Sequence, residues 1–216
     1  MHITRRLTAS SLLLLMAGCS SMYYGAMETV GVHKRDIMVD RVKGARDSQQ
    51  AAAKEFTDAL TQFKSVVNVK GGNLEKNYDK LNTALQKSDA RANEVHDRIA
   101  AVEDVSGALF AEWKAELKQY SSAELRKASE AQLNDAKARY KTLMASMKKA
   151  EGKLEPALSP LRDQVLFLKH NLNAKAIGGL TSEVASIQTK VDDLVRDLQA
   201  SVAEADAFIQ TLQPES

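Results

Sequence analysis

The chain has 216 residues, with 30 Lys and Arg against 28 Asp and Glu, and a single Cys. This near balance of charge argues against a nucleic-acid partner, because such binding requires an excess of basic residues on one face. A single Cys excludes a disulfide within the chain, so the fold has to be held by packing alone.

Residues 1–18 have the pattern of a signal peptide. Arg5 and Arg6 precede an apolar stretch that begins at Leu7 and contains the leucine run 12–15. The stretch spans about 11 residues, well short of the ~20 that a helix needs to cross the hydrocarbon core of a bilayer. We therefore expect an export signal that is removed, and not a membrane span.

The expected signal ends at the only Cys. The sequence Leu15-Met16-Ala17-Gly18-Cys19 resembles the lipobox of bacterial lipoproteins, whose cysteine is acylated and becomes the first residue of the mature protein. Such proteins carry two or three acyl chains, palmitate among them, and each buried methylene contributes about 0.8 kcal/mol. Ser20 stands where Asp would signal retention in the inner membrane, so the resemblance implies the outer membrane. The alternative, a secreted protein with a stray Cys, leaves the position of Cys19 unexplained.

Residues 19–26 are expected to form a short tether between the lipid and a single helical domain, residues 27–216. Tyr23 and Tyr24 lie where aromatic side chains can anchor a protein at the membrane interface, although an incidental origin is an equal alternative. Without Arg5 and Arg6 the 30 basic side chains become 28, equal to the 28 acidic ones. The exported protein would thus have no formal net charge.

The rest of the chain predicts an all-α fold, an elongated antiparallel bundle or coiled coil of about four long helices. Ala, Leu, Lys, Glu and Gln dominate, and apolar residues recur in alternating steps of four and three, as on one stripe of a helix. Turn signals at residues 71–73, 121–122 and 178–179 separate the helices. The expected helices are Met27–Val69, Leu74–Gln119, Ser122–Ala176 and Thr181–Leu212.

Two features leave this division open. Ser121 and Ser122 are weak helix breakers, so the second and third helices can alternatively form one rod of roughly 120 Å; we favour the four-helix version. Pro156 and Pro160 should kink or interrupt the third helix, because proline removes a backbone donor and clashes with the preceding turn.

Two short segments are candidates for contacts. Residues 34–41 combine dense charges of both signs with three apolar residues, which favours a solvated face; docking of a partner near the membrane is the alternative. Phe110 lies off the apolar stripe beside Trp113, and we expect both to make a core or dimer contact in preference to a cofactor pocket.

Residues 161–173 are the most unusual segment. Residues 165–168 are apolar all the way round the helix, so we expect them to be covered on more than one side, within the bundle or by a second subunit. We favour a polar layer that fixes the register of the helices over a partner or ligand site. The candidate residues are Arg162, Asp163, Gln164, Phe167, His170, Asn171 and Asn173.

The sequence offers no parts for catalysis. It has no phosphate-binding loop, no His-Glu-x-x-His and no Gly-x-Ser-x-Gly. His33, His96 and His170 are the only histidines after the signal, and the carboxylates are spread along helices, as solubility requires. We therefore expect no enzyme activity, no metal, no cofactor and no small-molecule substrate.

The segments 34–42, 71–76, 108–117 and especially 162–180 resemble a family of predicted Gram-negative lipoproteins, domain of unknown function 2959, over essentially the whole mature chain. The family brings no known activity or substrate. We expect an outer-membrane lipoprotein that faces the periplasm and has a structural, scaffolding or adaptor role through protein partners or self-association. The alternative is a periplasmic chaperone or envelope sensor; a cell-wall hydrolase would need converging carboxylates.

Overall fold

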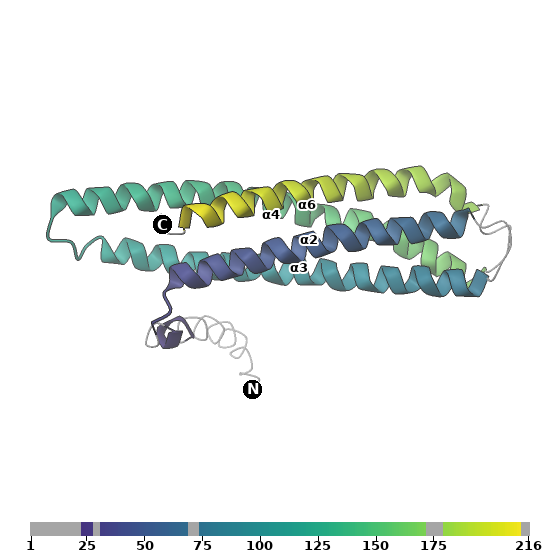
Figure 1. Ribbon diagram of the computed structural model, residues 1–216, viewed down its shortest axis with the longest axis horizontal. Helices are drawn as coiled ribbons and strands as arrows, with labels where there is room; N and C mark the ends of the chain where they lie inside the picture. Colours follow the sequence, from purple (N-terminus) through teal and green to yellow (C-terminus); the bar gives the residue numbers. More distant parts are fainter. Residues whose placement is uncertain (1–22, 28–30, 69–73, 172–178, 213–216) are drawn as a thin grey trace, which may run out of the picture.

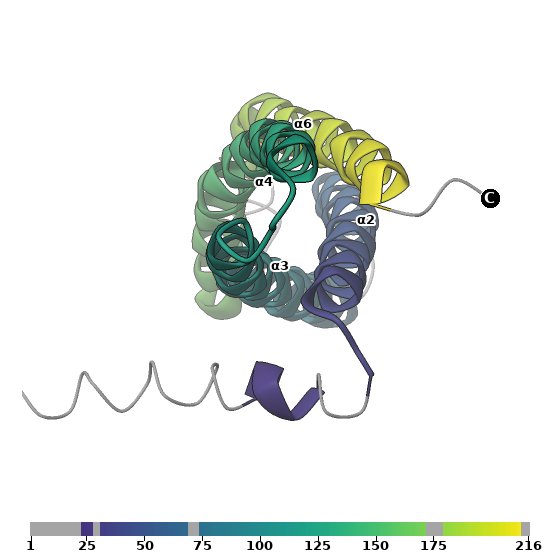
Figure 2. The same cartoon turned by 90° about the vertical axis from the view of Figure 1, so that its left-hand side faces the viewer.

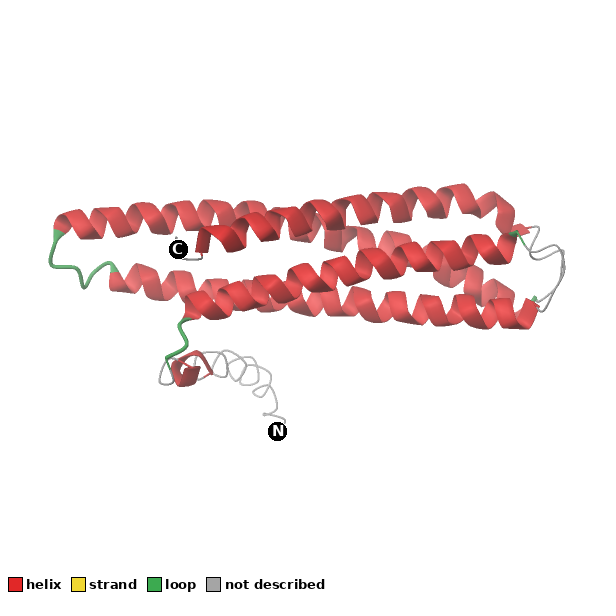
Figure 3. Ribbon diagram, in the orientation of Figure 1, coloured by secondary structure: helices red, strands yellow, loops and turns green. Residues whose placement is uncertain are grey.

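The protein is a bundle of four long helices. The computed structural model describes residues 23–27, 31–68, 74–171 and 179–212. The helices are α2 (Lys34–Val67), α3 (Leu74–Glu116), α4 (Ala123–His170) and α6 (Val184–Leu212), and the short 3-10 helix η1 (Thr181–Glu183) precedes the last of them. Figure 3 shows helices and loops and no strand in the described part of the chain. The expected all-α bundle is confirmed.

Each long helix runs antiparallel to the one before it (Figure 1). α2 packs against α3 and α6, and α4 packs against the same two helices, so the four surround a common core. The end-on view in Figure 2 shows this ring, with α3 diagonally opposite α6. The arrangement is an up-down-up-down four-helix bundle, which is the topology that short connections between long helices favour.

The core consists of the apolar stripes read from the sequence. In α3 the stripe from Leu81 to Val102 is buried, and in α6 so is the stripe from Ile187 to Leu198. α2 contributes its own four-three stripe, with Phe56 and Phe63 fully buried. Because each stripe covers one side of a helix, the four helices become stable only by burying their stripes together.

The break between α3 and α4 confirms the four-helix division and rules out the continuous rod. α3 ends at Glu116, and Ser122 caps the start of α4, where its Oγ accepts a hydrogen bond of 3.3 Å from the backbone N–H of Leu125. A serine at this position satisfies a donor that the first turn of a helix leaves free. The expected capping role of the serines is therefore correct.

The other expected helix ends differ by several residues. The first long helix starts at Lys34 and not at Met27, because Gly31 has a φ of +82°, which is left-handed backbone that a right-handed helix cannot contain. The third helix stops at His170 and not at Ala176, since Asn171 has a φ of −134°. α4 also runs through Pro156 and Pro160, so an interruption there was wrong.

The helices end unevenly at the end of the bundle where α2 begins. Here α3 and α4 extend past the first turn of α2 and the last turn of α6 as a two-helix hairpin (Figure 1). Between residues 123 and 142 the structure buries only Ser129 and Leu133. The hairpin is thus the least covered part of the described bundle.

None of the helices described is both long and apolar enough to cross a bilayer.

Candidate functional site

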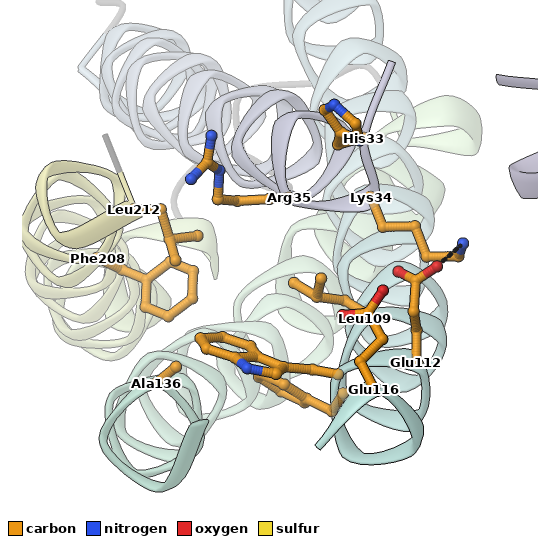
Figure 4. Close-up of a pocket in the computed structure, with 11 residues that line it drawn as sticks. His33, Lys34, Arg35, Leu109, Glu112, Glu116, Ala136, Phe208 and Leu212 are labelled. Atoms are coloured by element: carbon orange, nitrogen blue, oxygen red, sulfur yellow. Dashed lines mark hydrogen bonds and ion pairs between the residues drawn. The ribbon is translucent and has the colours of Figure 1, made fainter. Parts of the chain in front are cut away.

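A cavity of about 570 Å³ lies where the hairpin leaves the bundle (Figure 4). All four helices contribute to it: the first turn of α2, the last turns of α3 and α6, and the second half of the hairpin's α4 arm. Its floor is apolar and its rim is charged. The lining residues are His33, Lys34, Arg35, Leu109, Phe110, Glu112, Trp113, Glu116, Ala136, Phe208 and Leu212.

Phe110 and Trp113 join the two arms of the hairpin at this cavity. The Phe110 ring meets that of Tyr140 edge to face, with centroids 5.4 Å apart, and Lys137 Nζ lies 5.8 Å from the Phe110 ring centre. The Trp113 Nε1–H donates to Ser129 Oγ at 2.8 Å. Both aromatic residues are half-buried, so one side of each packs in the hairpin and another faces the cavity.

The rim of the cavity carries charges of both signs. Lys34 Nζ and Glu112 Oε1 form an ion pair of 2.9 Å that ties α2 to α3. Arg35 and Glu116 add one further charge of each sign. Because these charges balance, the rim suits a protein surface with polar and apolar groups better than a simple anion or cation.

Residues 34–41 are not the solvated face that the sequence favoured. Ile37, Met38 and Val39 are buried at the start of α2, while Arg35, Asp36 and Asp40 stay exposed. The segment therefore belongs partly to the core and partly to the cavity rim. Its three apolar residues form one block between two groups of charges, and consecutive residues point to different sides of a helix, which is why the sequence alone could not assign one face.

The residues around Arg162 do not converge on one site. The Arg162 guanidinium binds the carboxylates of Asp89 on α3 and Glu155 on α4, with Nε 3.0 Å from Asp89, and these hydrogen bonds raise its pKa. The Asn171 side chain donates to the carbonyl of Phe167 at 2.9 Å, within its own helix end. Of the candidate residues that the structure describes, only Arg162 thus hydrogen-bonds to a second helix, as a register-fixing residue would.

The apolar turn at residues 165–168 is covered on one side only by the described chain. Val165 and Leu168 are buried, whereas Leu166 is 62% and Phe167 46% exposed. Of the two expected ways to cover this turn, coverage within the bundle was therefore wrong, and coverage by a second subunit stays a prediction. Asp163 and His170 are exposed beside it and Gln164 is half-buried, while Asn173 and Cys19 lie outside the described residues.

A polar layer in the core was missed by the sequence analysis. Gln49 is fully buried at the centre of the α2 stripe, and neither its amide nitrogen nor its amide oxygen has a hydrogen-bond partner among the described residues. Ser201 Oγ and Asp197 Oδ2 on α6 are in the same state, although the other oxygen of Asp197 binds Lys149 at 2.9 Å. The signal was the four-three spacing from Met38 through Gln49 to Phe56, which places a glutamine at a core position.

The N-terminal turn at residues 23–27 also has a role that its sequence did not reveal. Tyr24 is 4% exposed, and its hydroxyl donates to Asp104 Oδ2 on α3. Burial, together with the Asp104 carboxylate, raises the pKa of the Tyr24 phenol. Tyr23 stands edge to face with it and is 42% exposed, so only one of the two tyrosines faces outward.

Comparisons with known proteins identify a family but no activity. The family model described as "Protein of unknown function (DUF2959)" matches residues 23–212, which confirms the family resemblance seen in the sequence. No curated protein matches the chain. Within residues 23–27, 31–68, 74–171 and 179–212, no group of three or more His, Cys, Asp or Glu is placed to hold a metal ion.

Proposed function

The chain belongs to the DUF2959 family of proteins of unknown function, and we propose that it is a lipid-anchored, non-enzymatic adaptor or scaffold of the cell envelope. Acylation of Cys19 holds it to the periplasmic face of the outer membrane. The bundle binds a protein partner through the cavity at its uneven end. The observation that carries the proposal is this apolar cavity of about 570 Å³ with a rim of both charges.

The chemistry of the cavity supports a protein as the ligand. Its floor offers Phe110, Trp113 and Phe208, and aromatic residues in partly buried pockets are the usual anchors of protein interfaces. The balanced rim can pair with charges of either sign around such an anchor. The groups that face the cavity are the His33 imidazole, carboxylates, cations and apolar side chains, a mixed arrangement that suits recognition of a protein surface.

In-cell photo-crosslinking tests the proposed cavity. A photoreactive residue at Glu116, which lines the cavity, should give one discrete adduct, whereas the same residue at the exposed Glu130 should give none. Filling the cavity with Ala136→Trp should abolish the adduct at 116. Ala138→Trp, on an exposed face of the same helix, is the matched control and should leave it unchanged. Equal labelling from both positions would remove the support for a cavity-bound partner.

The anchor is tested separately by Cys19→Ser. With the acyl acceptor removed, the protein should leave the membrane fraction and stay in the soluble periplasmic fraction or remain unprocessed. Continued association of the processed Cys19→Ser protein with the outer membrane would contradict the lipid anchor.

A periplasmic chaperone or envelope sensor is the second candidate, and the polar core layer favours it. Gln49 of α2 lines a cavity together with Leu198 and Val202 of α6, and Ser201 is buried on the same stretch of α6. Buried polar groups without partners weaken packing by about 1–3 kcal/mol each. These helices can therefore separate more easily than a fully apolar pair. Suppression of client aggregation by the purified protein, lost when the layer is made apolar, would favour this role over the adaptor.

A further inference from the structure

The N-terminal turn determines how the bundle sits relative to its anchor. Tyr24 is buried against α3, Met27 and Val32 pack on the core, and Val32 N–H donates to the Met27 carbonyl at 3.0 Å. Figures 1 and 2 place the turn on the outside of α2 and α3, at the end of the bundle where α2 begins. The turn is therefore part of the packed structure, and the free tether ends at Tyr24.

The turn also lies back from the end of the bundle. Tyr24 binds Asp104, whereas Lys34 at the start of α2 binds Glu112, about eight residues or roughly 12 Å further along α3. Tyr24 thus lies further from the hairpin end than the start of α2, which Gly31 precedes with its left-handed backbone. The attachment point is on the side of the rod and not at its tip.

The chain between the anchor and this point is short. About five residues separate Cys19 from Tyr24, and even a fully extended chain of that length spans at most about 18 Å. Whatever conformation these residues adopt, Tyr24 stays within about 18 Å of the membrane surface that holds the acyl chains.

An upright bundle does not fit this limit. Asp104 lies about 30 residues from the start of α3 at Leu74, so standing on that end would lift Tyr24 about 45 Å from the lipid. If the bundle stood on its hairpin, Tyr24 would lie above the membrane by the length of helix from Asp104 to Glu116, about 18 Å, plus the height of the turn at residues 117–122. Even with the tether fully stretched, that orientation would push the turn at residues 117–122 into the bilayer.

We propose that the anchored bundle lies along the bilayer, with the outer side of α2 and α3 facing the lipid and α6 facing the periplasm. This inference rests on the proposed lipid anchor at Cys19. The lipid-facing side carries Arg41 and Arg98 as well as Asp97 and Asp104, so the docked turn sets the orientation and charge attraction does not. In this orientation the cavity at the hairpin end stays open to a partner that approaches from the side or from the periplasm.

Two exposed alanines at the same height on opposite faces make a direct test. Gly44 lies beside the Arg98 side chain and Arg46 binds Asp206, so Ala100 on α3 and Ala207 on α6 are level along the rod. In the acylated protein Cys19 has no free thiol, so a cysteine placed at either position is the one that a fluorescent donor labels. Ala100→Cys and Ala207→Cys proteins are purified from membranes and reconstituted in phosphatidylethanolamine–phosphatidylglycerol vesicles with an acceptor on the lipid headgroups.

Energy transfer should place the donor at 100 nearer the lipid than the donor at 207 by about the width of two helix layers, ~20 Å. Tyr24→Ala in either background should undock the turn and remove this difference while the protein stays bound to the vesicles. Equal distances in the parent, or a shorter distance from 207, would overturn the orientation. Failure of the processed protein to carry lipid or bind vesicles would instead overturn the proposed anchor, so the two failures are distinguishable.

Discussion

Gln49 sits where the other members of the α2 stripe are apolar or small, and its amide has no partner among the described residues. Gln49→Leu should therefore stabilise the bundle by about 1–3 kcal/mol, because it removes an unpaired buried amide and keeps a similar volume. The measurement is the urea midpoint of the helical circular-dichroism signal. Gln50→Leu, on the exposed side of the same turn, is the control and should change stability by less than about 0.5 kcal/mol.

A destabilised Gln49→Leu protein would show that the amide is satisfied by water or by a bound group, and that the layer is not a weak point. This outcome would also count against the chaperone or sensor role, which depends on an easily separated α2–α6 pair.

Tyr24 predicts a pH dependence of the docked turn. The pKa of the Tyr24 phenol is raised in the folded protein. As the pH rises through ~10, an unfolded tyrosine begins to lose its proton while the folded protein still holds the proton on Tyr24. By linkage, the contribution of Tyr24 to the stability of the docked turn is complete below the pKa of an unfolded tyrosine and decreases as the pH rises toward the higher pKa of the folded protein. In a spectrophotometric titration at 295 nm, Tyr24→Phe should lose the latest-titrating step.

Tyr23→Phe is the matched control for this titration, because Tyr23 is the exposed neighbour of Tyr24. It should retain the late step. If Tyr24→Phe retains it as well, the phenol is not held by Asp104 in solution, and the free tether does not end at Tyr24.

At the scale of the helices, the sequence predicted most of the fold because the apolar spacing is regular. The stripes from Leu81 to Val102 in α3 and from Ile187 to Leu198 in α6 are buried as expected, and Ser122 caps α4 as its position suggested. The helix ends were less predictable. The backbone angles of Gly31 and Asn171 set where α2 begins and where α4 ends, and no residue pattern displays these angles.

The candidate site was only partly predictable, for a related reason. Phe110 and Trp113 could be singled out from their spacing. The cavity that they line exists because α3 and α4 extend further at this end of the bundle than α2 and α6. That difference in length depends on how four helices are aligned. The docking of Tyr24 onto Asp104, 80 residues away in sequence, is equally non-local.

Pro156 within α4 gives a prediction for that helix. A proline inside a helix leaves the carbonyl four residues earlier without its donor, which here belongs to Gly152. Because Pro156 is exposed and packs little, Pro156→Ala should raise stability by about 1–3 kcal/mol in thermal or urea unfolding.

Ser159→Ala, also exposed on α4, is the control and should have little effect. A loss of stability in Pro156→Ala would mean that the bundle requires a proline-induced bend for α4 to stay packed between α3 and α6.

At the scale of the molecule, the helix lengths make the protein a rod whose two ends differ. One end carries the last turns of α2 and α4 and the first turns of α3 and α6, and the other carries the projecting hairpin, the cavity and the N-terminal turn. In the proposed account the functional features therefore gather at the end nearest the anchor. A partner bound there would be held close to the outer membrane.

The proposed function and the proposed orientation both depend on acylation of Cys19. Intact mass spectrometry of the protein purified from bacterial membranes tests this acylation most directly. The account predicts a chain that begins at residue 19 and carries the added mass of a diacylglyceryl group, with or without a third acyl chain. A mature chain with an unmodified thiol at Cys19, or one that retains residues 1–18, would contradict it.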